Sequence, residues 1–347
     1  MSRPVNAVYY PSWRVYKDKP PSSLDLASIT HIFYAFVGVN EDGTLRLFDE
    51  WADMDKEVDG VKGCLAAINK IKTEHSHIKT IVSIGGGSGS KEFPALAANP
   101  DARWTFAVAI REFCDKHHLD GADIDWEHPQ DPEAGANYLL LLQDTRRALP
   151  SPWFLLTTAL PCGEYVLKHI NLAAASHVLD FINLMAYDFC GGWTDVSGHH
   201  AQLLPPSRNL NEVYPALRAS AHAGVEFLIS RGFPAARIVL GIPAYARFFG
   251  TARGAGHPFD GSGEMDYCDF PDHWVREACV EEGCATAHFV DTDGDKGFLS
   301  FDVPSTVRAK ARYVKEMGLA GLFYWTGVGD RPGDESLVAA GWSELQC

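Results

Sequence analysis

The sequence predicts an α/β fold, a (β/α)8 TIM barrel with a small α+β insertion between its seventh and eighth strands. Eight short runs rich in β-branched and aromatic residues recur along the 347 residues, and segments with helical periodicity separate most of them. The runs are apolar almost throughout, which indicates a parallel sheet covered on both faces. Eight such units favour a closed barrel over a doubly wound open sheet, which is the alternative.

The predicted elements follow one another in regular alternation. The strands are expected at 7–10, 29–39, 78–84, 121–126, 154–159, 181–187, 238–243 and 321–325. The clearest helices are expected at 58–74, 102–118, 134–149, 210–223 and 305–317. Asn99 before Pro100 is typical of a helix start, and Gly318 stands where a helix stop is expected.

A long gap separates the last two predicted strands, because one ends near Pro243 and the next begins near Gly321. Residues 248–299 are therefore expected to form an inserted α+β lobe, with 1–247 and 300–347 forming the catalytic barrel. Barrel active sites lie at the carboxyl ends of the strands, so we expect this lobe to form one wall of a cleft.

Composition excludes several partners. The formal charge is -15, and no cluster of basic residues offers a surface for nucleic acid. No apolar stretch is long enough for a membrane span, so we expect no membrane partner. We also expect the protein to be a monomer. The first residues, MSRPVNAVYYPSW, lack the apolar segment of a signal peptide. We therefore expect an intracellular or non-classically secreted protein, with an extracellular location as the alternative.

The most informative segment is LDGADIDWE at 119–127, where Asp123, Asp125 and Glu127 occupy alternate positions. On a strand their carboxyl groups face one way, about 6.6 Å apart. Crowded acids on a buried strand cannot all ionise cheaply, so at least one pKa should rise and one proton should be shared. A neutral Glu127 at the end of the strand suits a general acid that protonates the leaving-group oxygen of a glycoside.

Two alternatives for this segment are a solvated edge strand and a carboxylate metal site. Ile124 and Trp126 between the acids disfavour full exposure, and no partner cluster of histidines or further carboxylates is apparent nearby. The histidine pairs at 117–118 and 199–200 are adjacent rather than four residues apart, and we interpret them as surface or loop residues. We expect no metal and no cofactor.

Six motifs occur in order along the predicted barrel, and together they resemble family 18 of the glycoside hydrolases, the chitinases. The motifs are Tyr9-Tyr10, Ser83-Ile-Gly-Gly86, Asp120-Gly-x-Asp-x-Asp-x-Glu127, Met185-Ala-Tyr-Asp188, Tyr245-Ala-Arg247 and Tyr324-Trp325. The insertion resembles the small lobe of deep-cleft members. The resemblance implies that the substrate is chitin or an N-acetylglucosamine oligosaccharide.

The resemblance also implies a mechanism in which the substrate's own 2-acetamido oxygen is the nucleophile and an oxazolinium ion is the intermediate. Glu127 would be the general acid and then the general base, so that the anomeric configuration is retained. Asp125 would orient the acetamido N–H, and Asp123 would share a proton with Asp125. Tyr187 would hydrogen-bond the acetamido carbonyl.

Further residues are implied by the same comparison. Trp325 would form the floor of the cleaved sugar's pocket, because sugar rings present flat C–H faces to aromatic rings. Trp13 and Trp193 would be platforms on the two sides of the cleavage point. The other expected substrate-binding residues are Asp188, Met185, Arg247, Tyr245, Phe36 and Gly86, and the residues expected to support the acids are Tyr9 and Ser83.

The chain departs from the family pattern at Gly87, where many chitinases carry a tryptophan. We expect the corresponding aromatic platform to be absent, which favours soluble chains over crystalline chitin. Two alternative functions share the barrel. An endo-β-N-acetylglucosaminidase acting on N-glycans is disfavoured by the intact motif at 185–188 and by Trp325, and a chitin-binding lectin is disfavoured by Glu127.

Overall fold

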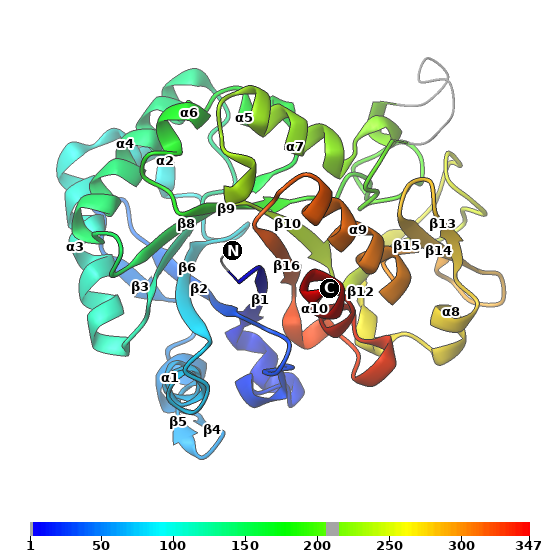
Figure 1. The fold of residues 1–347 in the computed structure, drawn as a ribbon, viewed down its shortest axis with the longest axis horizontal. Coiled ribbons are helices and arrows are strands. Elements are labelled where there is room, and N and C mark those ends of the chain that lie inside the picture. The colour runs from blue at the N-terminus through cyan, green and yellow to red at the C-terminus, as the bar shows by residue number, and fades with distance from the viewer. Residues whose placement is uncertain (1–2, 206–214) are drawn as a thin grey trace.

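The computed structural model describes residues 3–205 and 215–347, and its centre is a closed barrel of eight parallel strands (Figure 1). β1 pairs with both β2 and β16, and this pairing closes the sheet. The barrel strands are β1 (Val5–Pro11), β2 (His31–Val39), β6 (Lys79–Gly85), β7 (Gly121–Asp125), β8 (Leu155–Pro161), β9 (Phe181–Met185), β10 (Ile238–Pro243) and β16 (Gly321–Trp325). The predicted barrel is confirmed, and the open-sheet alternative is wrong.

Helices surround this barrel (Figure 1). They are α1 (Cys64–Glu74), α2 (Phe93–Ala98), α3 (Pro100–His117), α4 (Pro132–Ala148), α5 (Glu164–Leu167), α6 (Leu172–Ala175), α7 (Ala221–Ser230), α9 (Pro304–Glu316) and α10 (Leu337–Gln346). Asn99 caps α3 as predicted, because its Oδ1 accepts from the backbone N–H of Asp101 at 3.0 Å. Gly318 follows α9 with a φ of +65°, a conformation that glycine adopts without strain.

Shorter elements complete the chain. β3 (Leu45–Leu47) pairs antiparallel with the end of β2, and β4 (Glu57–Val58) pairs antiparallel with β5 (Val61–Lys62). Single turns of 3-10 helix occur at Ser12–Lys17, Pro21–Ser23, Pro215–Arg218, Ala235–Arg237, Tyr267–Asp269, Gly327–Gly329 and Gly333–Glu335, and a π-helical turn at Trp51–Asp55.

Two predicted helices have wrong boundaries. The helix expected from 58 begins only at Cys64, because the preceding residues form the β4–β5 hairpin and Gly63 turns the chain with a φ of +82°. The helix expected at 210–223 falls partly on residues outside the described ranges. In its described part the helix begins at Ala221, where Ser220 Oγ accepts from the backbone N–H of Ala223. Helical periodicity alone did not locate these caps.

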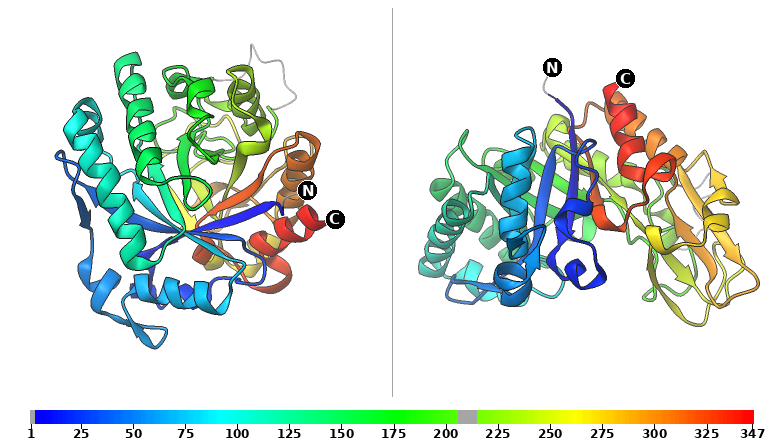
Figure 2. Two further views of the ribbon diagram at one scale, coloured as in Figure 1. Left: turned by 60° about the vertical axis from the view of Figure 1, so that its left-hand side comes forward. Right: turned by 90° about the horizontal axis from the view of Figure 1, so that it is seen from below.

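An antiparallel sheet with the order β12-β11-β15-β14-β13 lies between β10 and β16 in the chain. Its strands are β11 (Tyr245–Phe249), β12 (Ser262–Asp266), β13 (Cys279–Glu281), β14 (Thr286–Asp291) and β15 (Gly297–Phe301), and it carries the short helix α8 (Asp272–Arg276). Figure 2 shows it beside the barrel, away from α3 and α4. The insertion between the seventh and eighth barrel strands is confirmed, whereas its delimitation as a lobe of 248–299 stays a prediction.

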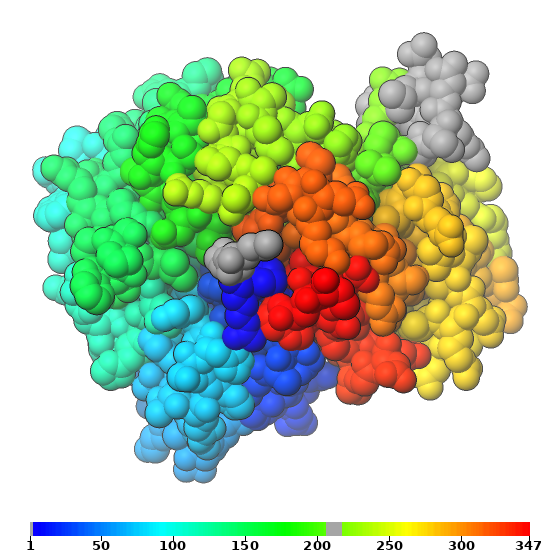
Figure 3. All heavy atoms as spheres, viewed as in Figure 1, coloured from blue at the N-terminus to red at the C-terminus, as the bar shows by residue number. Residues whose placement is uncertain are grey.

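Two apolar clusters hold these layers together, and a third, smaller one around Phe249 and Phe298 lies in the lobe. One lies inside the barrel around Tyr9, Phe33 and Phe323, and a larger one fills the space between the strands and the helices and continues into the lobe. α10 packs beside β1, where Asn6 Nδ2 donates to Val338 O, and Figure 3 shows the two chain ends adjacent at the surface. Within the described ranges, no helix combines the length and apolar character needed to cross a membrane.

Candidate active site

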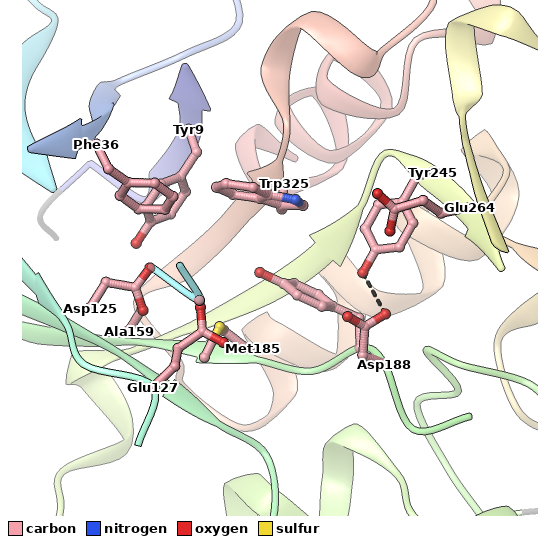
Figure 4. Close-up of a pocket in the computed structure, with 12 residues that line it drawn as sticks. Tyr9, Phe36, Asp125, Glu127, Ala159, Met185, Asp188, Tyr245, Glu264 and Trp325 are labelled. Carbon is pink, nitrogen blue, oxygen red and sulfur yellow. Dashed lines mark hydrogen bonds between the residues drawn. The ribbon is translucent and has the colours of Figure 1, made fainter. Parts of the chain in front are cut away.

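A pocket opens at the carboxyl ends of the barrel strands, where barrel enzymes place their chemistry (Figure 4). The rings of Tyr9, Phe36 and Trp325 lie across it from the carboxyl groups of Asp125 and Glu127 (Figure 4). Its lining residues are Tyr9, Phe36, Gly87, Asp125, Glu127, Ala159, Met185, Tyr187, Asp188, Tyr245, Glu264 and Trp325.

Asp123 lies beneath this pocket and is fully buried. Its carboxylate accepts from the hydroxyls of Tyr9 and Ser83 at 2.8 Å each and from Thr157 at 2.7 Å, and Asn183 Nδ2 lies 3.5 Å away. Burial raises the pKa of Asp123, while these hydrogen bonds to its ionised form act in the opposite direction. The hydrogen bonds thus offset part of the effect of burial, and the pKa of Asp123 remains raised.

Asp125 follows on the same face of β7 and is 3% exposed. Its Oδ1 has no hydrogen-bond partner among the described residues. Burial raises its pKa well above the ordinary value, and the nearby charges of Glu127 and Asp123 raise it further. A raised pKa favours the protonated form of the Asp125 carboxyl group.

Glu127 stands just beyond the end of β7, and its carboxyl group faces the pocket (Figure 4). Its backbone N–H donates to Ser90 Oγ at 2.8 Å, and the same hydroxyl lies 2.8 Å from the carbonyl oxygen of Gly86. The loop after β6 thus fixes the backbone of Glu127. Burial raises the pKa of Glu127, and the negative charge of Asp188 raises it as well.

Asp188 is the ionised carboxylate of the pocket. Arg247 holds it with two hydrogen bonds of 2.8 Å, and the Tyr245 hydroxyl donates to its Oδ1 at 2.7 Å. Burial would raise the pKa of Asp188, but the nearby His200 ring and the hydrogen bonds and positive charge of Arg247 outweigh burial and lower it. Its backbone has a φ of +60°, which is uncommon outside glycine.

The sequence predicts the histidine pair at 199–200 at the surface or in a loop, and the pair lies in a loop that is buried. His199 is 6% exposed and His200 is fully buried, with His200 Nδ1 3.5 Å from Asp188 Oδ1 and its ring 5.1 Å from that of Tyr245. The loop after β9 is covered by the antiparallel lobe, where Ser300 Oγ accepts from the backbone N–H of His200. The neighbouring positions of the two histidines in the sequence gave no sign that the lobe buries them.

Met185 at the end of β9 and Tyr187 just after it line the pocket, and Met185 lies beside Glu127 (Figure 4). The Tyr187 ring meets Tyr245 and Phe323 edge to face, each with centroids 6.1 Å apart. Burial raises the pKa of Tyr187, and the charge of Asp125 raises it further, so the hydroxyl stays protonated and able to donate.

The aromatic side of the pocket is built around Trp325. Its ring stacks on Phe36 with centroids 5.6 Å apart and lies 5.6 Å from Tyr9. Gly86 makes room for this stack, since a Cβ atom there would lie 2.5 Å from the Phe36 ring and its φ is +75°. The ring face of Trp325 left open to the pocket can receive an apolar sugar face.

Trp13 and Trp193 lie at the margins and do not line the central pocket. Trp13 is 44% exposed and packs 6.1 Å from Phe36, and Trp193 is 60% exposed beneath the Arg247 guanidinium at 4.9 Å. Trp193 lines an adjoining hollow that also contains Glu127. Trp13 thus lies beside Phe36 of the pocket lining, and Trp193 lies beside Arg247, which holds the pocket residue Asp188.

The sequence did not single out several neighbours of the site. Thr157, Asn183 and Ser90 hold the acids, and Ala159 and Glu264 line the pocket. No local sequence pattern marks these residues, because each approaches the acids or the pocket only when different strands or the lobe are brought together. Gly87 leaves open space, since a Cβ atom there would lie 3.8 Å from the Glu127 carboxyl group.

Comparison with known proteins places this arrangement in context. Residues 5–330 match the family described as glycosyl hydrolases family 18. "Endochitinase 1" of Metarhizium robertsii is 33% identical over 366 residues, covering 98% of this chain and 85% of that protein. "Chitinase 1" of Aphanocladium album is 33% identical over 362 residues, covering 96% and 84%. The structure of chitinase ChiA74 from Bacillus thuringiensis superposes with a TM-score of 0.88 at 26% identity, covering 100% of this chain and 70% of that one.

Proposed function

The chain belongs to family 18 of the glycosyl hydrolases, and we propose that it is a retaining chitinase that hydrolyses β-1,4 links between N-acetylglucosamine units. The relatives that are 33% identical to it are named chitinases, which supports this substrate class. The observation that carries the proposal is the arrangement of Asp123, Asp125 and Glu127. The hydrogen-bonded carboxyl group of Asp123 lies beneath the pocket, and Glu127, the proposed proton donor, lines it.

In the first step Glu127 gives its proton to the leaving-group oxygen as the glycosidic C–O bond breaks. The acetamido oxygen of the same sugar forms the new bond to the anomeric carbon, which produces an oxazolinium ion. Water then attacks that carbon from the face that the leaving group vacated and returns a proton to Glu127. Two inversions at one carbon retain the β configuration.

Asp125 and Tyr187 are the groups proposed to position the acetamido arm. The Asp125 carboxyl lies too near Glu127 on one strand face to attack from the opposite side, so it accepts the acetamido N–H and stabilises the positive charge that develops there. The protonated Tyr187 hydroxyl donates to the acetamido oxygen. Asp123, whose carboxyl group accepts from three hydroxyls, is proposed to share a proton with Asp125, so that Asp125 can carry the negative charge when the acetamido N–H binds.

Asp188 contributes through its charge. Arg247 keeps it ionised, and its negative charge is one of the causes of the raised pKa of Glu127. A raised pKa keeps the general acid protonated at higher pH, which is what the first step requires. Asp188 also faces the pocket, where it can accept from a sugar hydroxyl.

The surroundings of the pocket bear on the form of the substrate. Trp325 is proposed as the floor for one sugar ring, and the exposed Trp13 and Trp193 are proposed to stack on neighbouring sugars of a chain. Gly87, which lines the pocket beside Glu127, offers no aromatic ring there. We infer that the enzyme acts on soluble chains or oligosaccharides in preference to crystalline chitin.

The test is a product analysis of N-acetyl-chitotetraose to chitohexaose, with anomers resolved before they equilibrate in water. Prompt β-anomeric products are expected from retention. Initial α-anomers would contradict the mechanism, and oligosaccharide binding without cleavage would favour the lectin. Cello-oligosaccharides are the matched control, because they lack the acetamido nucleophile and should not be cut. Their hydrolysis at a comparable rate would exclude substrate assistance.

A further inference from the structure

Two imidazoles and a carboxylate meet where the lobe touches the loop that follows β9. We propose that His199, Glu281 and His288 bind one divalent transition-metal ion, of which zinc fits the donor set best. His199 Nε2 lies 3.0 Å from Glu281 Oε1, and His288 Nδ1 lies 3.4 Å from the same oxygen. All three potential ligand atoms lie within 4.8 Å of one another. Two histidines and one carboxylate form a common protein set for zinc, with water as the fourth ligand.

The strands of the lobe fix two of the three donors. Glu281 ends β13, and His288 lies on β14, where it is paired with Ser300 of β15. His199 comes from 82 residues before Glu281 and is 6% exposed. Three donors on separate, packed segments make a site that the fold brings together before an ion arrives.

Neighbouring groups orient both rings. Ser300 Oγ lies 3.4 Å from His199 Nδ1, so a proton on Nδ1 can be donated to that hydroxyl while the Nε2 lone pair faces the cluster. The Phe298 ring packs against both imidazoles, with centroid distances of 5.5 Å to His199 and 5.2 Å to His288. This packing restricts the two rings before metal binds.

The cluster has unused binding capacity. His288 Nδ1 is shielded from solvent and has no hydrogen-bond partner in the described part of the chain. The Glu281 carboxylate offers a negatively charged oxygen ligand beside the two imidazoles. The Glu281 side chain is 42% exposed, which gives an ion access and leaves room for water. A cation between the three groups would satisfy the His288 nitrogen that the protein leaves unpaired.

The site would fasten the lobe to the loop that carries His200, the next residue after a proposed ligand. His200 Nδ1 lies 3.5 Å from Asp188 Oδ1 in the pocket. Metal binding would therefore stabilise the junction that forms this side of the cleft. The sequence alone gave no sign of this cluster, because its ligands come from segments that are distant in the sequence.

The test uses the full chain, treated with a chelator that is then removed, and titrated with zinc by calorimetry and with cobalt by visible absorption. We expect one equivalent of each metal to bind and zinc to raise the melting temperature. Cobalt should give tetrahedral visible bands without a thiolate charge-transfer band, since no ligand is a cysteine. A thiolate band at one equivalent, or the absence of stoichiometric binding, would overturn the proposal.

Two ligand variants and two controls locate the ion. His288→Gln and Glu281→Gln should each weaken zinc binding by about 100-fold or more and abolish the zinc-dependent rise in melting temperature. His273→Gln, a histidine of the same lobe outside the cluster, and Cys268→Ser, from the other group of possible ligands at 266–269, should bind zinc as the parent does. The exposed Glu281 keeps the test valid if the His288 variant misfolds. Unchanged binding by a folded ligand variant would refute the site, as would loss of binding in Cys268→Ser.

Discussion

At the scale of single residues, the carboxyl groups of the pocket differ because their neighbours differ. Asp123 is surrounded by hydroxyl donors, Asp125 by other acids, and Asp188 by Arg247 and His200. All are largely buried, so burial alone would raise every pKa. Local donors and cations thus separate the group that carries a charge from the groups that carry a proton.

Replacing Glu127 with glutamine is expected to lower kcat by about 100-fold or more, because an amide cannot supply the proton to the leaving group. Oligosaccharide binding should remain close to that of the parent, since the aromatic floor is untouched. Initial rates on chitohexaose together with binding calorimetry measure both effects. Glu133→Gln, at an exposed position in the first turn of α4, is the matched control. Retention of most activity by the Glu127 variant would contradict its role.

Asp125→Asn is expected to stabilise the fold at neutral pH while it removes activity. The folded-state pKa of Asp125 is raised, so the folded chain binds this proton more tightly than the unfolded chain. The wild type therefore loses stability as pH rises from the unfolded pKa through the folded one. The asparagine variant does not lose stability in this way, because its side chain does not titrate.

Urea unfolding at several pH values tests this prediction. The variant should be more stable than the wild type by on the order of 1 kcal/mol for each unit of pKa shift avoided at neutral pH. The difference should disappear near pH 3, where both states of the wild type are protonated. Asp195→Asn, at an exposed position, should show no such trend. A difference that grows toward low pH would show that the sign is wrong.

At the scale of elements, α9 is fastened to the lobe by a buried ion pair. Lys310 on α9 is 1% exposed, and its Nζ donates to both oxygens of Asp302 and to the carbonyl oxygen of Ala201. Asp302 directly follows β15, and Ala201 lies on the loop after β9. One ammonium group thus joins a barrel helix, the lobe and the loop that carries His200.

Lys310→Met should lower the free energy of unfolding by about 3–5 kcal/mol, because it leaves the Asp302 carboxylate buried without its partner. Lys315→Met is the control on the same helix. Its ammonium pairs with Glu344 at the surface, where about 1 kcal/mol or less is expected. Chemical denaturation of the three proteins measures the differences. Equal losses in the free energy of unfolding for the two substitutions would show that the buried ion pair matters no more to stability than the surface pair.

At the scale of the whole molecule, the lobe and the barrel share one apolar core. Tyr267 and Phe301 of the lobe belong to the same continuous cluster as Leu240 and Tyr324 of the barrel. The lobe also contains a smaller cluster of its own around Phe249 and Phe298. Because the larger cluster crosses from the lobe into the barrel, we expect the cleft wall and the barrel to unfold as one cooperative unit.

We therefore expect a single thermal unfolding transition in which the lobe and barrel lose structure together. Calorimetry should give similar van't Hoff and calorimetric enthalpies, and hydrogen exchange should protect β11 and β15 as strongly as the barrel strands. A separate, earlier transition accompanied by rapid exchange in the lobe alone would contradict this prediction.

The sequence by itself determined the closed barrel, the place of the insertion and the row of acids on β7. These features depend on local patterns, namely apolar runs, caps such as Asn99 and alternation along one strand. The same patterns failed at the helix starts near Cys64 and Ala221, where a turn residue or a cap set the boundary.

Only the tertiary structure decided the surroundings of those acids. Thr157 and Asn183 reach Asp123 from β8 and β9, and His200 reaches Asp188 because the lobe covers its loop. The meeting of His199 with Glu281 likewise depends on how the lobe docks. Such contacts join residues far apart in the chain, and strand register and burial, rather than any local pattern, bring them together.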